Sequence, residues 1–428
     1  MNYRHYLGDR IFNKRVAALL FVVMMAFPMR FWITMGPFSS FSVSDVAIIT
    51  AAFAWVGYSL VSGTVPVGSN RIFGALLIPL VIGAVSLLWT VDKIQTLKVL
   101  VVYAEAIAAF LTTIFLFRFL TLESIAILIK IYLCIVIFSA VFSYLEIPGF
   151  HAQIPPGLSW EIQDAYYITY DARFSHPFIG QSNNLASILA FFPFILASCF
   201  RITGSKSYIW ILCLTIIAIM ATLSRGVLLS LGIGLLIHLF TRNIKLMNVR
   251  RLIGCVVIIT IGVVMFFTFN PVALTHLRER LSPAEIYTRI ELFQQTINAV
   301  KKAPFFGYGA GVSLNLITES SLQSVHNTYL EQLLYFGIIG GIPVLAAFLA
   351  IPILIIKIPV LNQSARTMRK AVALSMVIQL LIFMSHPSFE ATLLRVLILF
   401  SLGIGISLIY AANRKSTILA RRIPINGS

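Results

Sequence analysis

Residues 333–357 read LLYFGIIGGIPVLAAFLAIPILIIK and contain no charged side chain before Lys357. A helix rises about 1.5 Å per residue, so about twenty apolar residues cross a hydrocarbon core of about 30 Å. Similar runs recur along the chain, of which 59% is hydrophobic and only 11% charged. A soluble protein of 428 residues needs more polar surface than this. The sequence therefore predicts an integral membrane protein and excludes a soluble enzyme.

The apolar runs predict about twelve transmembrane helices in a single integral membrane domain, 1–428. Helices are expected because lipid offers no partner for unpaired backbone groups. The predicted spans are 16–35, 43–62, 72–89, 99–119, 124–146, 184–201, 208–223, 226–240, 252–269, 333–357, 371–385 and 393–412. The expected fold is thus an all-α polytopic membrane protein, with two long loops, 147–183 and 270–332, on one side.

The chain has a net charge of +17, and the positions of its Lys and Arg residues indicate how it is oriented in the membrane. With an even number of spans, most of the Lys and Arg outside the spans fall on the side that holds both termini. These residues are Arg4, Arg10, Lys14, Arg15, Arg201, Lys206, Arg242, Lys245, Arg250, Arg251, Lys357, Arg366, Arg369, Lys370, Arg414, Lys415, Arg421 and Arg422. The positive-inside rule then predicts cytoplasmic termini and outward-facing long loops. No nucleic-acid partner is inferred, and the first apolar run is expected to span the membrane rather than to be a cleaved signal.

The loop 270–332 contains a predicted amphipathic helix. Ser282-Pro283-Ala284-Glu285 forms a capping box with proline at the first helical position. The helix is expected to end near Lys301-Lys302-Ala303-Pro304, where cations suit a helix C-terminus and proline stops the helix. Its predicted apolar stripe consists of Ile286, Ile290, Phe293, Ile297 and Val300. We expect this helix to lie on the membrane or on the helix bundle.

Two arginines on the predicted outer side are candidates for anion binding. Arg289 lies at the margin of the apolar stripe, where it is within reach of an interfacial phosphate; an ion pair with Glu285 is the alternative. Arg225 lies in the turn between two spans and is followed by Gly226. A functional charge and a side chain that snorkels to the interface are both consistent with this position. Lys130, Glu105 and Arg30 fall within predicted spans, and structural ion pairs are expected for them.

A glycine-rich element and a histidine follow the amphipathic helix. Gly307-Tyr308-Gly309-Ala310-Gly311 permits a tight turn or a close backbone approach, but no strand precedes it as a dinucleotide site would require. Asn327 is a candidate N-cap for the next helix, which places His326 just outside that helix. A structural histidine is the alternative to a catalytic one. The chain has only 15 acidic residues and no DxD or HExxH motif, so no metal is predicted.

Four motifs together resemble the O-antigen ligase and O-antigen polymerase superfamily of bacterial envelope enzymes. They are Ser224-Arg225-Gly226, Arg289-Ile290-Glu291-Leu292-Phe293, Pro304-Phe305-Phe306-Gly307-Tyr308-Gly309 and His326-Asn327-Thr328-Tyr329-Leu330. Each motif is degenerate, whereas their order and their common side of the membrane are more specific. The resemblance covers about 180–345 by motif. Ser175-His176-Pro177 and the following Gly180–Asn184 segment depart from a looser element of the family, and no role is assigned to them.

The resemblance implies a GT-C-like glycosyltransferase in the bacterial inner membrane. Its implied donor is an undecaprenyl-diphosphate-linked glycan, its implied acceptor is lipid A–core oligosaccharide, and its active site is periplasmic; membrane lipids are further partners and no cofactor is needed. Arg225 and Arg289 match the arginines that bind the diphosphate, and His326 matches the catalytic histidine. Asn327, Tyr329, Gly307 and Gly309 are candidate substrate-binding residues. Arginine grips phosphate through a bidentate fork, and neutral histidine can accept the proton of an attacking hydroxyl.

The motifs leave the acceptor open. A ligase transfers the glycan to lipid A–core, a polymerase transfers it to another lipid-linked repeat, and a protein-directed oligosaccharyltransferase is a third variant. The compact outer loop favours the ligase. A lipid-linked sugar transporter is the alternative from another class, although it predicts charges along an internal pathway, and here the candidate charges gather at one membrane face.

Overall fold

The structure is a computed structural model in which almost every described residue is helical. It describes residues 32–34, 40–62, 70–144, 182–240, 283–317, 327–384 and 392–422. The helices are α3 (Val43–Ser62), α4 (Asn70–Ser86), α5 (Lys93–Phe117), α6 (Leu122–Tyr144), α8 (Ser182–Leu189), α9 (Pro193–Thr203), α10 (Ser207–Ala221), α11 (Arg225–Phe240), α14 (Pro283–Lys302), α15 (Thr328–Ile356), α16 (Gln363–Phe383) and α17 (Thr392–Arg422). A 3-10 helix, η2 (Leu314–Leu316), lies between α14 and α15.

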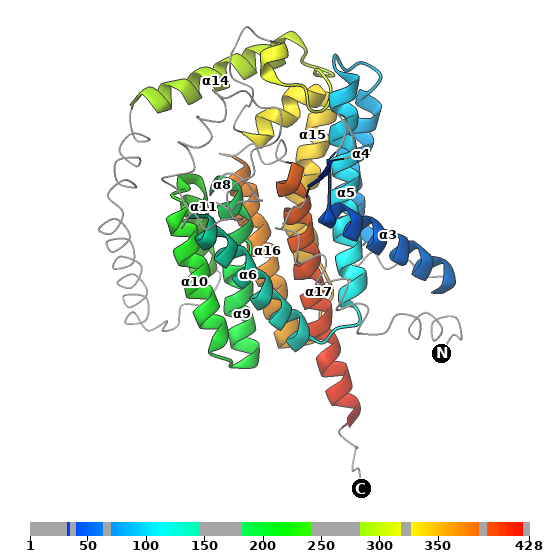
Figure 1. Cartoon of the computed structure of the whole chain (residues 1–428), viewed down its shortest axis with the longest axis vertical. Coiled ribbons are helices and arrows are strands. Elements are labelled where there is room, and N and C mark those ends of the chain that lie inside the picture. The colour runs from blue at the N-terminus through cyan, green and yellow to red at the C-terminus, as the bar shows by residue number, and fades with distance from the viewer. Residues whose placement is uncertain are drawn as a thin grey trace.

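Most of the helices run side by side as a bundle (Figure 1). The helix α17 packs against α5, α16 and α6, and α15 packs against α4 and α16. The helix α14 lies across one end of the bundle, which we call the upper end, and α17 protrudes from the opposite, lower end (Figure 1). Large side chains fill the core between the helices, among them Phe110, Phe115, Tyr132, Phe192 and Phe400.

Five stretches are long and apolar enough to cross a membrane. They are Lys93–Phe117, Leu122–Phe142, Ser182–Thr203, Thr328–Ile356 and Val396–Arg414. Shorter apolar helices cover Ile48–Leu60, Asn70–Ser86, Ser207–Ala221 and Arg225–Leu239. The chain is therefore a helical, multi-pass membrane protein. The predicted number of twelve spans stays a prediction, because 252–269 and most of 16–35 lie outside the described residues.

One predicted span was wrong in detail, and another, 184–201, lies within the candidate span Ser182–Thr203 but is not one continuous helix. Trp32–Thr34, expected to end the first helix, is strand β1, which pairs antiparallel with β2 (Ser40–Ser42). Aromatic and β-branched residues such as Trp32 and Ile33 favour this extended conformation. The predicted span 184–201 is divided into α8 and α9. The backbone tightens at 190–192, and Pro193, which has no N–H to donate, starts the second helix.

Candidate functional site at the upper end of the bundle

The helix α14 has the predicted bounds, because it begins at Pro283 and ends at Lys302. Among its described side chains, Leu292, Thr296 and Ala299 are buried and share one face. Two members of the predicted apolar stripe, Ile290 and Ile297, are 45% and 42% exposed, so they do not face the bundle. The helix packs against α15 through a face that also contains small and polar residues, so the buried face is rotated away from the most apolar one.

The glycine-rich element after α14 is hydrogen-bonded to a break in α15. At Gly337 the backbone of α15 leaves helical geometry, with φ 60° and ψ −161°. The N–H groups of Tyr308 and Gly309 donate to the carbonyls of Leu334 and Tyr335 over 3.0 and 2.9 Å. A break inside a membrane helix exposes polar backbone groups that lipid cannot pair. The loop supplies the missing partners.

The pairing continues on the other side of the break. The N–H groups of Ile338 and Ile339 donate to the carbonyls of Pro304 and Phe305 over 2.8 and 3.1 Å. Residues 304–309 and 334–339 thus exchange four backbone hydrogen bonds. These bonds fix the end of α14 relative to the first part of α15. Arg289 belongs to α14, and His326 lies just before α15 in the chain.

Only glycine fits the closest points of this joint. Gly307, Gly309 and Gly337 have φ of 65°, 101° and 60°, a region that other residues rarely adopt. A Cβ on Gly307 would lie 2.6 Å from the backbone N of Gly337, and a Cβ on Gly337 would lie 2.6 Å from the backbone N of Phe306. The predicted close backbone approach of the glycines is confirmed. Their role in substrate binding stays a prediction.

The turn between α4 and α5 holds the same loop from its other side. Thr96 Oγ1 donates to the Ala310 carbonyl over 2.8 Å, and Trp89 Nε1 donates to the Phe306 carbonyl over 2.9 Å. The hydroxyl of Tyr308 donates to the Ala299 carbonyl of α14 over 3.1 Å, and burial raises the pKa of Tyr308. The loop is therefore bonded to the α4–α5 turn, α14 and α15.

Asn327 is the predicted N-cap of the helix after His326. Its Oδ1 accepts from the N–H groups of Tyr329 and Leu330 over 2.9 and 3.1 Å, which confirms the cap. Its Nδ2 also donates to the Met384 carbonyl over 3.0 Å, and the Tyr329 hydroxyl donates to the Leu380 carbonyl over 2.7 Å. The helix α15 begins at Thr328, five residues before the predicted span, and its first turn is bonded to the upper end of α16.

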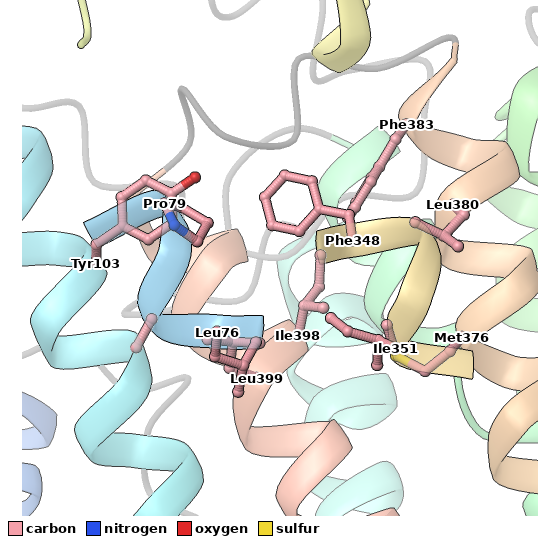
Figure 2. A pocket seen from close by; sticks show the side chains of 11 residues that line it. Leu76, Pro79, Tyr103, Phe348, Ile351, Met376, Leu380, Phe383, Ile398 and Leu399 are labelled. Atoms are coloured by element: carbon pink, nitrogen blue, oxygen red, sulfur yellow. The ribbon is translucent and has the colours of Figure 1, made fainter. Parts of the chain in front are cut away.

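A small cavity lies below these bonds, between α4, α5, α15, α16 and α17 (Figure 2). Its volume is about 30 Å³. Its lining residues are Leu76, Pro79, Tyr103, Ala106, Phe348, Ile351, Met376, Leu380, Phe383, Ile398 and Leu399. Its lining is apolar except for the hydroxyl of Tyr103. None of the sequence-predicted site residues lines the cavity.

Arg225 is the first residue of α11, directly after the turn from α10. The turn is stabilised by Thr222, whose Oγ1 donates to the Ile219 carbonyl and accepts from the Ser224 N–H. Ser224 is buried and Arg225 is half-buried. A turn between these two helices is confirmed, but it covers 222–224, and Arg225 and Gly226 already belong to α11. Because α10 runs toward the upper end, α11 starts at the end of the bundle where α14 lies (Figure 1).

The other two charged candidates are placed only by their elements. Arg289 belongs to the second turn of α14, and the placement of its side chain lies outside the described residues, as does His326. His326 directly precedes the N-cap Asn327 in the chain. The structure thus brings the start of α11, the helix α14 and the start of α15 to one end of the bundle. Within the described ranges no three His, Cys, Asp or Glu side chains form a group that could hold a metal ion.

A comparison with protein families finds a match for part of this arrangement. Residues 210–345 match the family model described as O-Antigen ligase. This region carries the O-antigen ligase domain. The match begins within α10 and ends within α15, so it includes Arg225, Arg289, the glycine loop and His326. The resemblance to the O-antigen ligase superfamily is thereby confirmed. No curated protein matches the chain.

The region 210–345 is held in place by structural features and hydrogen bonds that the sequence did not predict. The break at Gly337 was missed, and the only local signal for it is the glycine-rich run of Gly337, Gly340 and Gly341. Glu331 is buried and accepts a hydrogen bond from the Tyr335 hydroxyl over 2.8 Å. The supports from the α4–α5 turn and from α16 lie outside 210–345 altogether.

One expectation for an intramembrane charge was wrong. Lys130 was predicted to form an ion pair, but its Nζ donates to Ser207 Oγ over 3.0 Å and lies 4.5 Å from the centre of the Tyr208 ring. A cation over an aromatic face is stabilised by the ring quadrupole, which reduces the need for a carboxylate. Arg30 lies outside the described residues.

Proposed function

We propose that the chain is an inverting, metal-independent glycosyltransferase of the O-antigen ligase type. It transfers a glycan from undecaprenyl diphosphate to lipid A–core oligosaccharide at the periplasmic face of the inner membrane. The observation that carries the proposal is that one family match, 210–345, includes three elements that lie toward the upper end of the bundle. Those elements are the start of α11, the helix α14 and the start of α15.

The two arginines bind the donor diphosphate in this proposal. Each guanidinium is positively charged at any physiological pH and donates two parallel hydrogen bonds to phosphate oxygens. The negative charge on the diphosphate increases as the glycosidic bond breaks, so Arg225 and Arg289 stabilise the transition state more than the bound substrate. The half-buried position of Arg225 strengthens this effect because less water screens the charge.

His326 acts as the general base. The oxygen of an acceptor hydroxyl attacks the anomeric carbon, the bond from that carbon to the diphosphate oxygen breaks, and the hydroxyl proton passes to the imidazole. Attack from the side opposite the diphosphate inverts the anomeric configuration. The cap formed by Asn327 and its bond to α16 hold the adjacent backbone, which supports a fixed position for His326.

The proposed orientation places the upper end in the periplasm and both termini in the cytoplasm. It is supported by four basic residues. Arg201 is in the last turn of α9, Lys357 caps the end of α15, Arg369 is in the second turn of α16, and Arg414 ends the candidate span Val396–Arg414. The loops 147–183 and 270–332 are periplasmic in this orientation. Labelling of single cysteines in intact cells, in a variant that lacks native cysteines, tests the assignment: a cysteine near the C-terminus should be protected and one in 283–302 accessible.

The decisive experiment is a transfer assay with purified protein in lipid, undecaprenyl-diphosphate oligosaccharide, lipid A–core acceptor and a chelator. Glycan on the lipid A–core supports the ligase. A lengthening ladder on undecaprenyl diphosphate with untouched acceptor would instead establish a polymerase. Movement of donor across the membrane without a new glycosidic bond would establish a transporter, and transfer that stops with chelator would contradict metal independence.

Three variants test the roles of the charged residues. Arg225→Ala, Arg289→Ala and His326→Ala should each lower the transfer rate by at least a hundredfold. Lys302→Ala, which removes an exposed cation from the same helix as Arg289, is the matched control and should keep the rate of the unmodified protein. Near-normal turnover in well-folded Arg289→Ala and His326→Ala proteins would show that the assignment of roles is wrong.

A further inference from the structure

Two arginines meet at the lower end of the bundle, far from the proposed active site. Arg118 is the C-cap of α5 and directly follows the candidate span Lys93–Phe117. Arg414 is the last residue of the candidate span Val396–Arg414. Residues immediately beyond the apolar part of a spanning helix lie at the level of the lipid headgroups. Both guanidinium groups are therefore at a membrane interface.

The guanidinium of Arg118 is positioned by aromatic rings. Its carbon Cζ lies 4.9 Å from the centre of the Tyr58 ring and 5.5 Å from that of Phe119. The two rings pack edge to face, 6.2 Å apart, and Tyr58 is buried between α3 and α5. A cation stacked on rings is held in place while its N–H groups remain available at its edge.

Arg414 reaches from α17 to the turn between α5 and α6. Its Nη1 donates to the carbonyl of Arg118, and its Nη2 donates to the carbonyl of Leu120 over 3.4 Å. Capping of free carbonyls at a helix end explains these two bonds. It does not explain why the capping cation is placed beside a second arginine, because two adjacent positive charges repel each other.

Among the described residues, no carboxylate pairs with either guanidinium. In the part of the chain that the structure describes, Arg118 and Arg414 form no salt bridge, and their contacts are the rings and carbonyls given above. Two neighbouring guanidinium groups with free N–H donors match a phosphodiester, which carries one negative charge and several acceptor oxygens. We propose that Arg118 and Arg414 together bind the headgroup of an anionic membrane lipid.

The position of the two arginines favours a lipid over free phosphate. Arg118 directly follows the candidate span Lys93–Phe117, and Arg414 ends the candidate span Val396–Arg414. A phosphodiester bound between them is therefore at the level at which lipid headgroups lie. Juxtamembrane arginines attract anionic lipid at about 1 kcal/mol each, which corresponds to about fivefold in affinity. Free phosphate has no acyl chains in the bilayer that would keep it at this interface.

Native mass spectrometry of the full chain tests the proposal. The protein is released from nanodiscs of equal parts phosphatidylcholine and phosphatidylglycerol, and the lipids that it retains are counted. We expect phosphatidylglycerol to be retained in preference to phosphatidylcholine. Arg118→Gln and Arg414→Gln should each weaken that retention about fivefold. Arg366→Gln, which removes an exposed arginine of α16 at the same end, should leave it unchanged.

Three results would overturn the proposal: no preference for phosphatidylglycerol, equal retention in all three glutamine variants, or displacement of the lipid by millimolar inorganic phosphate. If a glutamine variant fails to fold, Arg118→Lys and Arg414→Lys are compared with Arg366→Lys in the same way. Lysine keeps the charge but loses the planar fork and much of the stacking on Tyr58, so the first two should still retain less lipid than the third.

Discussion

The backbone N–H of Tyr308 donates a hydrogen bond of 3.0 Å to the carbonyl of Leu334. This bond joins the loop after α14 to the point where α15 breaks at Gly337, and three parallel bonds accompany it. A membrane helix can be interrupted only where protein replaces its lost hydrogen bonds. The relation between the glycine loop and α15 is therefore the feature on which the upper end of the bundle depends.

Substitution of Gly337 should disrupt this joint. In Gly337→Ala the new Cβ meets the backbone of Phe305 and Phe306, and φ of 60° with ψ of −161° is accessible almost only to glycine. We expect the free energy of unfolding to fall by about 1–3 kcal/mol and glycan transfer to be lost. Gly232→Ala in α11, where the added Cβ meets nothing within 4 Å, should leave both unchanged or slightly improved. Equal unfolding midpoints for the two variants in lipid nanodiscs would contradict the prediction.

Asn327 has two functions that one pair of substitutions separates. Asn327→Asp keeps an acceptor for the N–H groups of Tyr329 and Leu330 but removes the donor to the Met384 carbonyl, whereas Asn327→Ala removes both. Loss of an N-cap costs about 1 kcal/mol, so the alanine variant should have the lower thermal midpoint. Transfer should be reduced in both variants if the tie to α16 positions His326. Full activity in a stable Asn327→Asp variant would assign Asn327 to capping alone.

The hydroxyl of Tyr329 should stabilise the contact between α15 and α16. Tyr329→Phe removes only the donor to the Leu380 carbonyl and is expected to cost about 0.5–1.5 kcal/mol of stability. Tyr287→Phe on α14 is the control, because Tyr287 is 70% exposed. Chemical denaturation of the two variants in mixed micelles provides the measurement. A larger loss in Tyr287→Phe than in Tyr329→Phe would show that the α15–α16 contact has been misjudged.

Thr96 is expected to matter more than its neighbours on α5. Its Oγ1 donates to the Ala310 carbonyl of the glycine loop over 2.8 Å, whereas Thr113 Oγ1 donates to Ala109 of its own helix. Both side chains are fully buried. Thr96→Val should therefore loosen the loop and increase hydrogen exchange at 307–311, and Thr113→Val should not. Unchanged exchange at 307–311 in Thr96→Val would mean that the other bonds of the loop, to α15, α14 and Trp89, hold it without Thr96.

Features that depend on neighbouring residues were predicted correctly. The start of α14 at Pro283, its end at Lys302 and the cap at Asn327 follow from signals within a turn of the position concerned. The candidate motifs were likewise recognised as linear strings, and the match over 210–345 confirms the family. Local hydrogen bonds and backbone angles decide where a helix is capped and where it ends. Because particular residue types favour these bonds and angles, the helix ends can be predicted from nearby residues.

Features that depend on distant partners were missed. Gly337 lies in a run of apolar residues that continues past it, so hydropathy alone predicts an unbroken span. The break is stable because backbone groups of 304–309 form hydrogen bonds with those of 334–339. A local sequence pattern does not indicate a partner thirty residues away along the chain. The same holds for the face of α14, where packing against α15 buries Thr296 and leaves Ile290 exposed.

The sequence by itself determined that the chain is a helical membrane protein, because transfer of apolar side chains into lipid is a property of each run on its own. The order of its short motifs also indicated the resemblance to the O-antigen ligase superfamily that the family match over 210–345 supports. Only the tertiary structure decided which backbone groups pair across the upper end and how Arg118 comes to lie beside Arg414. Those relations join residues far apart in the chain, and their free energy exists only once the helices are packed.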